Sequence, residues 1–486
     1  MTKRWLKLAA VPVALALVAG ACGDDDDDAS DSEETTAETE ADGGDGDDAE
    51  GGDEGDAGGS GDVPAANPDA AGAKFTLFGA STGTEGDAMA GFIDVYNEAA
   101  GTEITWTGSD DFEAQLRIRI DGGDPPAVAA TPQPASICTT AVGSAVALED
   151  LGYDIAELET NHSKAWMDLG LCEDGMHYGV PGWPNYKSIV FYHEPTFEAA
   201  GYEIPTTYEE LVALSEQAVA DGWTPWCFGY ESGGATGWPG TDWIEDIYGR
   251  TVDQETYSAW TKGEVRFEDE GVQNAFGIFE EILFGDGFVL GGAENVPGVA
   301  FSDSSGPLFQ DNAGPNGDGP GCLMLKQGSF IQNFFNQQPD YEEGEEEEIG
   351  VFDFPSVEGN TIALGGGDTF IVFDDDPAVA AVVQDWTSPE WQCVLASGHG
   401  VEGVERLPGH KDTSLDCYEN ENNRKFAAAV TEALGSNTFY FDGGDLMDPA
   451  VGQGSFWEGM VVHAQGTPVP DVVAVSYTHL RAHETS

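Results

Sequence analysis

The sequence predicts an α/β fold. Short runs rich in β-branched and aromatic residues alternate with segments whose apolar residues recur at helical spacing. The alternation occurs in three stretches, which begin near residues 74, 189 and 360. Strands that alternate with helices favour parallel sheets joined by right-handed crossovers.

The first stretch shows the pattern most clearly. Residues 74–80 predict a strand, and the segment after the turn at 81–84 places Met89, Phe92 and Tyr96 on one helical face. The other elements are expected as strands at 103–107, 127–130, 189–192, 226–230, 322–326 and 360–373, and as helices at 111–120, 208–220, 272–283 and 377–386.

Length and composition allow a large globular body. The chain has 486 residues, 40% of them hydrophobic, with 12 Trp and 25 Phe. At roughly 150 residues per domain, two or three domains fit. No internal repeat is evident.

The charge is strongly negative. Asp and Glu number 90 against 17 Lys and Arg. Nucleic acids and anionic membrane surfaces are therefore excluded as partners, because both require clustered cations. We interpret the acids mainly as a solvated surface in a salty medium, where screening over about 10 Å weakens self-repulsion.

The N-terminal residues predict export. Lys3, Arg4 and Lys7 precede an apolar run at residues 8–21 that is too short to span a bilayer comfortably. Small residues then precede Cys22 in a pattern that resembles a bacterial lipobox, so we expect residues 1–21 to be a lipoprotein signal peptide and Cys22 to be acylated. Ordinary secretion with a free Cys22 is the alternative.

Two further segments are set apart by composition. Residues 22–72 consist mainly of Asp, Glu, Gly and Ala, which predicts a disordered, extended tether. Residues 476–486 break the acidic composition and resemble translated sequencing-adapter DNA. We expect this tail to be non-native and a final helix to be missing.

The remaining cysteines predict disulfides. Six are left after Cys22, an even number in an exported chain, and they allow 15 pairings. We expect pairing in sequence order, which closes the shortest loops, among Cys138, Cys172, Cys227, Cys322, Cys393 and Cys417. None forms a CxxC pair or lies with His at zinc-ligand spacing, so we expect no metal site and no cofactor.

Residues 74–470 resemble the extracellular solute-binding proteins of carbohydrate ABC importers. The matching segments are Thr131-Pro132-Gln133-Pro134, Gly175-Met176-His177-Tyr178-Gly179-Val180-Pro181, Ile189-Val190-Phe191-Tyr192 with Phe197-Glu198-Ala199-Ala200-Gly201, Pro205-Thr206-Thr207-Tyr208-Glu209-Glu210-Leu211 and Leu325-Lys326-Gln327-Gly328-Ser329-Phe330. Their order and spacing carry the resemblance. Residues 237–246 resemble the α-glucoside-binding branch.

The resemblance implies a two-lobed periplasmic-binding-protein-like fold with a ligand cleft between the lobes. Lobe 1 would comprise residues 73–187, lobe 2 residues 188–364, and residues 365–475 would return to lobe 1. Hinge crossings are expected near residues 183–189 and 364–368, where glycines permit unusual backbone angles and close approach. A simple turn is the alternative at the glycines.

Sugar recognition needs flat aromatic faces and directional polar groups. The residues that could supply them, or approach the ligand with backbone, are Glu85, Asp110, Asp111, Gln133, Trp183, Tyr186, Trp238, Asp242, Trp243, Gly366, Asp368, Asp442 and Trp457. A Trp is as often core as ligand platform, although Trp238 lies among Gly and Pro in an expected loop, which favours a binding role. Asp110 or Asp111 could simply cap a helix. The spacing of Asp442, Asp445 and Asp448 does not fit an EF-hand.

The expected function is capture of a sugar and its delivery to an ABC permease, by a monomer anchored through lipid at the outer face of the cell membrane. The rival functions are an exported glycoside hydrolase and a non-transport polysaccharide-binding surface protein. The sequence shows no GxSxG elbow, P-loop or HExxH motif, and eight βα units are not evident.

Overall fold

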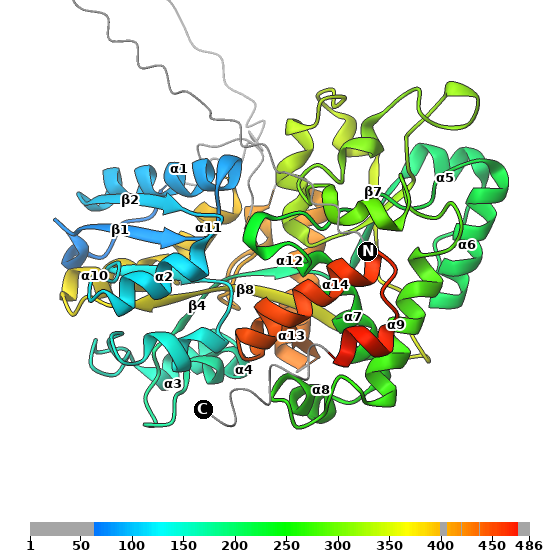
Figure 1. Ribbon diagram of the computed structural model, residues 1–486. Coiled ribbons are helices and arrows are strands. Elements are labelled where there is room, and N and C mark those ends of the chain that lie inside the picture. Colours follow the sequence, from blue (N-terminus) through cyan, green and yellow to red (C-terminus); the bar gives the residue numbers. More distant parts are fainter. Residues whose placement is uncertain (1–62, 399–405, 419, 437, 475–486) are drawn as a thin grey trace, which may run out of the picture. The chain divides into compact units, whose positions relative to one another are not determined.

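The computed structural model describes residues 63–398, 406–418, 420–436 and 438–474 (Figure 1). These residues build two β-sheets. The strands are β1 (Lys74–Gly79), β2 (Glu103–Gly108), β3 (Val128–Thr131), β4 (Val180–Tyr186), β5 (Ile189–His193), β6 (Met324–Lys326), β7 (Ile349–Asp353), β8 (Ala363–Val372) and β9 (Phe439–Phe441).

The first sheet has the order β2-β1-β3-β8-β4, with β9 also beside β8, and the second has the order β6-β5-β7. β1 pairs in parallel with β2 and β3, as the alternation predicted. β8 runs antiparallel to β3 and β4, and both pairs of the second sheet are antiparallel. The expectation of wholly parallel sheets was therefore wrong. β8 enters the first sheet from the second, so no helical crossover fixes its direction.

Helices flank the sheets. They are α1 (Gly83–Ala100), α2 (Phe112–Asp121), α3 (Ile155–Asn161), α4 (Lys164–Met167), α5 (Glu194–Ala200), α6 (Tyr208–Asp221), α7 (Trp238–Thr251), α8 (Gln254–Thr261), α9 (Glu270–Leu283), α10 (Pro377–Trp386), α11 (Pro389–Ala396), α12 (Glu421–Ser436), α13 (Gly443–Leu446) and α14 (Trp457–Ala464). No helix of the described ranges combines the length and apolarity that crossing a membrane requires.

Each sheet carries its own hydrophobic core. One core joins β1 and β3 to α1, α10 and α11, and it includes the predicted face of α1. The other joins the second sheet to α6, α7, α9 and α14. Because α14 packs on α7 (Figure 1), the expectation that residues 365–475 return wholly to lobe 1 is wrong for its last part.

Three segments cross between the sheets side by side. Lys187 lies between β4 and β5, and its backbone N–H donates to the Leu364 carbonyl at 2.8 Å. The Leu364 N–H donates in turn to Ser188 Oγ at 2.8 Å. The Asp442 N–H donates to the Gly365 carbonyl at 2.7 Å. The crossings are therefore tied to one another by backbone hydrogen bonds.

The six cysteines pair in the expected sequential order. The structure joins Cys138 to Cys172, Cys227 to Cys322 and Cys393 to Cys417, with Cα–Cα distances of 5.3, 5.4 and 5.3 Å. Cys22 lies outside the described residues, as do the signal peptide and the C-terminal tail.

Three local expectations need correction. Residues 226–230 form no strand; Trp226 makes only isolated bridges to Val289 and Met324. The expected tether ends too late, because Ala70 is fully buried and the Asn67 N–H donates to Asp385 at 2.8 Å. Trp238 lies at the start of a helix rather than in a loop. That helix begins after Gly237, whose φ is 116°, and it has a proline in its first turn.

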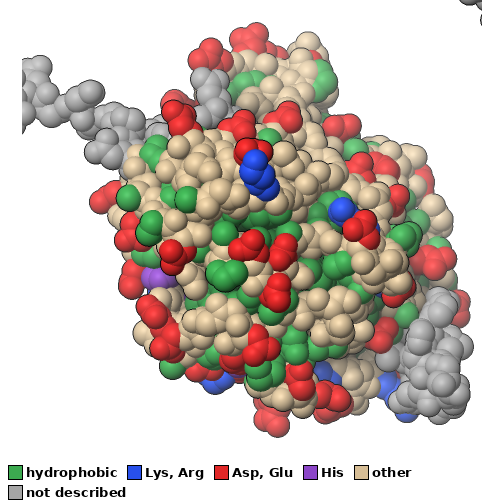
Figure 2. Space-filling view, turned by 90° about the vertical axis from the view of Figure 1, so that its left-hand side faces the viewer, with side chains coloured by type: hydrophobic (Ala, Val, Ile, Leu, Met, Phe, Trp, Pro, Cys, Tyr) green, Lys and Arg blue, Asp and Glu red, His purple; other side chains and the backbone are tan. Residues whose placement is uncertain are grey.

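The surface carries the acidic excess that the composition indicated. On the face shown in Figure 2, Asp and Glu side chains are spread widely, while Lys and Arg side chains are few. This distribution fits a solvated acidic surface better than a cation-rich interface.

The backbone at the β8 crossing leaves no room for a side chain. A Cβ at Gly367 would lie 2.7 Å from the Trp183 carbonyl oxygen and 2.5 Å from the Trp166 indole. We predict that Gly367→Ala lowers the free energy of unfolding by about 1–3 kcal/mol through overpacking.

Gly277→Ala is the control for this prediction. Gly277 lies inside α9, and its Cβ would have nothing within 4 Å. This change should stabilise by about 0.4–1 kcal/mol. Urea unfolding of both variants decides, and equal stability of the Gly367 variant and the wild type would contradict the close-packing argument.

Candidate functional site

A cavity of about 520 Å³ lies at the carboxyl ends of the parallel strands. On the side of the first sheet it is lined by the turns that follow β1, β2 and β3, and by Asp368 and Arg406. On the other side it is lined by residues near the start of α7, by residues 300–302 and by a 3-10 segment at Ser329–Gln337. Ligands of open α/β sheets bind at this edge.

One wall of the cavity is aromatic. The Trp238 ring lies 5.1 Å from the Phe301 ring and 5.8 Å from the Phe330 ring, centroid to centroid. Phe301 also contacts Phe334, at 5.6 Å. All four side chains line the cavity. They form an apolar face of the kind that covers the C–H side of a sugar ring.

The opposite side is polar. Arg406 lies 3.2 Å from Glu85 and donates to Ser81 Oγ at 3.2 Å. Asp110 accepts a hydrogen bond from the Thr82 hydroxyl at 2.6 Å. Burial raises the pKa of Asp368 to about 6, partly opposed by the positive charge of Arg406. These groups present both donors and acceptors to the cavity.

Gln133 offers a hydrogen-bond acceptor that the protein leaves without a partner. The residue is 6% exposed and lines the cavity, and its Oε1 is buried with no hydrogen bond. A buried unpaired amide oxygen costs free energy, typically about 1–3 kcal/mol. A ligand hydroxyl would supply the missing donor.

The floor of the cavity is a buried charge cluster centred on Lys187. The Lys187 ammonium lies 2.9 Å from Asp242 and 2.5 Å from Asp442, and all three side chains are at most 7% exposed. Burial lowers the pKa of Lys187, but the charges of Asp242, Asp442 and Asp445 outweigh burial and raise it well above its usual value. Lys187 is therefore a permanent ammonium.

The neighbouring acids hold protons more tightly than usual. Burial raises the pKa of Asp242 to about 7, against the attraction of Lys187. Burial and the charge of Asp442 raise the pKa values of Glu245 and Asp445 well above the usual range. Glu245 also accepts the backbone N–H groups of Gly443 and Gly444, at 2.8 and 3.0 Å.

The same cluster contains three carboxylates at metal-binding spacing. Oxygens of Asp242, Glu245 and Asp442 lie within 4.8 Å of one another. Lys187 contacts two of the three, so the cluster already holds a cation at its centre.

The structure brings seven of the predicted site residues together. Those that line the cavity are Glu85, Asp110, Gln133, Trp238, Asp368, Asp442 and Trp457. Asp242 lies directly behind them, against Lys187. Asp110 accepts from Thr82 and the Asp111 side chain makes no capping hydrogen bond, so neither acts as a simple helix cap.

Five predicted residues do not line the cavity. Trp183, Tyr186 and Trp243 are 3%, 4% and 1% exposed and belong to hydrophobic cores. The Gly366 N–H donates to Asn185 Oδ1 at 2.9 Å, so its close approach is to protein. Asp111 lies against the loop at Gly234. Tertiary packing, which local sequence does not show, directs these four side chains and the Gly366 backbone toward protein and away from the cavity.

Sequence reasoning also missed lining residues, chiefly Lys187, Arg406, Asp445, Phe301, Phe330 and Phe334. The two basic residues carried a usable signal. The chain has only 17 Lys and Arg residues, so a lysine within the first crossing indicates a charge that is held by a specific partner rather than a solvated surface charge. The phenylalanines carried none, since the chain has 25 of them.

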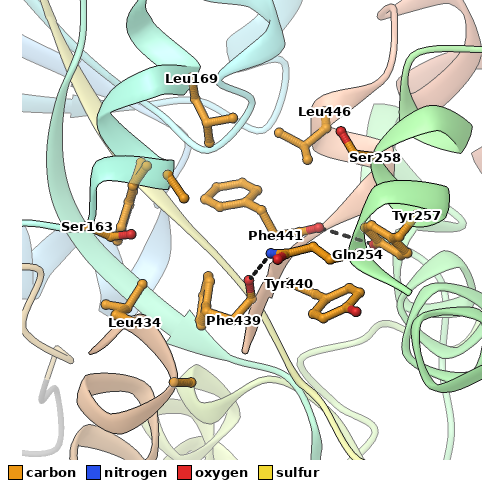
Figure 3. Close-up of a pocket in the computed structure, with 13 residues that line it drawn as sticks. Ser163, Leu169, Gln254, Tyr257, Ser258, Leu434, Phe439, Tyr440, Phe441 and Leu446 are labelled. Atoms are coloured by element: carbon orange, nitrogen blue, oxygen red, sulfur yellow. Dashed lines mark hydrogen bonds between the residues drawn. The ribbon is translucent and has the colours of Figure 1, made fainter. Parts of the chain in front are cut away.

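A second cavity, of about 310 Å³, lies beside β9 (Figure 3). Its lining contains no charged residue and is dominated by side chains such as Leu169, Leu434 and Phe439. The polar groups of Gln254 and Tyr257 donate to the carbonyls of Phe439 and Phe441, at 3.4 and 3.1 Å. The larger cavity is therefore the better candidate for a polar ligand.

The charge cluster yields a prediction about pH. Lys187→Met removes one partner of a buried ion cluster and should cost about 3–5 kcal/mol of stability near neutral pH. Without the ammonium, the folded-state pKa of Asp242 rises further above its ordinary value, and the pKa of Asp442 loses the lowering that the Lys187 charge provides. Carboxyls with raised pKa values lower stability as the pH rises. The loss of unfolding free energy caused by Lys187→Met should therefore be larger at pH 8 than at pH 5. Urea unfolding of the variant and the wild type at both pH values measures it.

The exposed pair Lys425–Glu421 gives the matched control. It spans 3.2 Å with side chains 57% and 80% exposed, so Lys425→Met should change stability by less than about 1 kcal/mol at either pH. A Lys187 variant that loses the same amount at both pH values would contradict the proposed electrostatics.

Comparisons with known proteins agree with this geometry. Over 421 residues, 85% of this chain and 94% of the relative, the sequence is 34% identical to the osmoprotective compounds-binding protein GgtB of Synechocystis. Over 420 residues, 84% of this chain and 86% of the relative, it is 36% identical to the alpha-glucosides-binding periplasmic protein AglE of Rhizobium meliloti.

Solved structures share the fold. The bacterial solute receptor AcbH superposes with a TM-score of 0.69 at 18% identity, covering 85% of this chain and 99% of AcbH. A chitin oligosaccharide binding protein gives a TM-score of 0.66 at 20% identity, covering 85% and 99%. The fold is thus the two-lobed α/β fold of periplasmic solute-binding proteins. Residues 80–392 match the family profile, and the chain belongs to the bacterial extracellular solute-binding proteins.

Proposed function

We propose that this protein captures a neutral sugar in the 520 Å³ cavity and delivers it to the permease of an ABC importer. The observation that carries the proposal is the pairing of an aromatic wall with directional polar groups, including the unpaired Gln133 oxygen. The cavity volume lies within the range of about 300–1,000 Å³ for small-molecule sites. The family consists of non-enzymatic binders found outside the cytoplasm.

The charges narrow the ligand class. The lining contains seven acidic side chains but only two basic ones, Lys187 and Arg406. Each of these bases already contacts carboxylates. Sugar phosphates and uronic acids would meet repulsion there, whereas neutral hydroxyls would find acceptors. An α-glucoside is the first choice and another oligosaccharide the second, supported by the 36% identity to AglE.

The 34% identity to GgtB supports a neighbouring candidate, a neutral osmoprotective compound. Its capture would use the same polar groups as an α-glucoside. Binding measurements with a series of α-glucosides and a series of neutral osmoprotective compounds separate the two candidates.

We further propose that the crossings act as a hinge. Lobe 1 begins near residue 73 and ends at Lys187, lobe 2 spans 188–364, and β8 returns to lobe 1. The lining includes polar side chains of lobe 1, such as Glu85, Asp110 and Gln133, and the aromatic wall of lobe 2. A ligand that contacts both lobes binds the closed state better and shifts the population toward it.

A sugar panel tests this function. We predict that a neutral α-glucoside raises the melting temperature, since a ligand at 100 times its Kd adds about 2.7 kcal/mol. Sugar phosphates should have no effect. Product release from oligosaccharides would instead indicate a hydrolase. Sugar binding without permease-dependent uptake would indicate a non-transport surface protein.

Two tryptophans of α7 locate the binding site. Trp238→Ala should weaken sugar binding at least tenfold, about 1.4 kcal/mol, because it removes the centre of the aromatic wall. Trp243→Phe is the control. Trp243 is buried in the core, so the change should lower stability but leave calorimetric affinity per folded molecule unchanged. Unchanged affinity in the Trp238 variant would remove it from the site.

We also propose that the mature protein is acylated at Cys22, monomeric and fully oxidised at the other six cysteines. Two acyl chains hold a protein at a membrane where one holds it only marginally. Cys22→Ala should therefore release the protein into the medium with sugar binding intact. Mass spectrometry of unreduced wild type should find acyl chains on Cys22 and no thiol that alkylates. Membrane-retained Cys22→Ala protein would contradict the anchor.

A further inference from the structure

Away from both cavities, the structure leaves one buried histidine nitrogen without a partner. His177 is 7% exposed, and its Nε2 is buried with no hydrogen bond. The residue ends a turn that begins after Leu171, with which it forms an antiparallel bridge, and the turn contains Cys172, the partner of Cys138. A bare imidazole nitrogen in such a position costs free energy unless a donor or a metal ion reaches it.

The other ring nitrogen is held by Glu149. His177 Nδ1 lies 2.9 Å from Glu149 Oε1, and the His177 backbone N–H donates to the same carboxylate at 3.1 Å. A carboxylate acceptor places the proton on Nδ1 and leaves the Nε2 lone pair free. Carboxylate–histidine pairs of this type orient the imidazoles that ligate metal ions.

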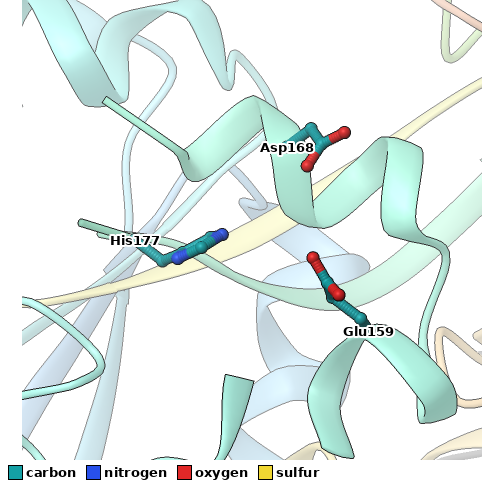
Figure 4. A group of neighbouring side chains, drawn as sticks. All are labelled: Glu159, Asp168 and His177. Carbon is teal, nitrogen blue, oxygen red and sulfur yellow. The ribbon is translucent and has the colours of Figure 1, made fainter. Parts of the chain in front are cut away.

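Two further carboxylates converge on the free nitrogen. Ligand atoms of Glu159, Asp168 and His177 all lie within 4.8 Å of one another. Figure 4 shows the His177 ring directed into the space between the two acidic side chains. Glu159 belongs to α3 and Asp168 directly follows α4, so three separate segments meet at this point.

Lys164 forms ion pairs with the two acids but leaves the histidine nitrogen without a partner. Its ammonium lies 3.1 Å from Glu159 and 2.5 Å from Asp168, and its side chain is 62% exposed. Exposed ion pairs contribute only about 0–1 kcal/mol, so the lysine can be displaced at little cost. A divalent cation would replace it and would also pair with Nε2.

We propose that Glu159, Asp168 and His177 bind a divalent transition metal ion, with zinc as the ion that fits best. Zinc accepts imidazole nitrogen and carboxylate oxygen as ligands, and three protein ligands leave a fourth tetrahedral position for water. Calcium and magnesium prefer all-oxygen ligands, so the histidine disfavours them. The partly exposed acids provide a path for the ion.

The site would act as a clamp within lobe 1. It would tie α3, the end of α4 and the hairpin that carries His177. None of its three residues lines the sugar cavity. We therefore expect zinc to raise the melting temperature and to leave sugar affinity unchanged, which makes this proposal independent of the proposed function.

Calorimetric titration of the full-length protein with Zn²⁺, in excess Mg²⁺ to occupy acidic surface groups, tests the site. We expect one high-affinity equivalent in the wild type. It should disappear in His177→Ala and in Asp168→Asn. Glu149→Gln should weaken it by about 10–100-fold through loss of histidine orientation. Lys164→Ala should tighten it by about fivefold, the equivalent of removing a competing exposed pair.

Glu157→Gln is the control, because Glu157 is an exposed acid on the same helix and lies outside the cluster. Its zinc binding should equal that of the wild type. Asp168→Asn alters an exposed side chain, so it keeps the test valid if His177→Ala misfolds. Absence of the high-affinity equivalent in the wild type, or its persistence in Asp168→Asn, would overturn the proposal.

Discussion

The arrangement of the site depends on one buried lysine. Lys187 lies in the first crossing between the sheets, and its ammonium contacts Asp242 of α7 and Asp442, which follows β9. One side chain thus joins three segments that are distant in sequence. Each carboxylate would be costly to bury alone, since removing one partner of a buried ion pair costs several kcal/mol. The cluster therefore favours the one arrangement in which all three segments meet beneath the cavity.

A second group of buried ion pairs lies behind the cavity. Lys326 and Arg250 both pair with Asp246, and all three side chains are at most 1% exposed. Ser188 of the first crossing also donates to Asp246, at 2.7 Å. A chain with 17 bases places three of them in this interior region. The acidic excess is tolerated on the surface by hydration and salt, whereas each buried acid near the crossings needs a specific partner.

Sequence reasoning located the elements better than their directions. Helix α10 has the predicted bounds, and α1 buries the predicted face, because apolar spacing encodes both. The antiparallel direction of β8 was missed, since it depends on a return from the second sheet. Seven of the residues proposed from sequence to bind ligand line the cavity, and three of them, Glu85, Asp110 and Gln133, follow the parallel strands β1, β2 and β3 closely in sequence. Trp183, Tyr186 and Trp243 were not, because a tryptophan or tyrosine next to a hinge has the same local pattern whether it faces the ligand or the core.

The two lobes supply different kinds of lining residue, which would link ligand binding to the proposed closure. Asp110 and Gln133 come from loops at strand ends of lobe 1 and Glu85 from the first turn of α1, whereas Phe301 and Phe330 come from lobe 2. Polar groups alone would exchange hydration for hydrogen bonds at little net gain, and an aromatic wall alone would not discriminate among sugars. A pyranose between the two surfaces satisfies the hydroxyls on one side and covers its C–H face on the other. If the crossings act as the proposed hinge, a closed state would gain both contributions to binding and an open state only one, so affinity would depend on how the crossings hold the two surfaces together.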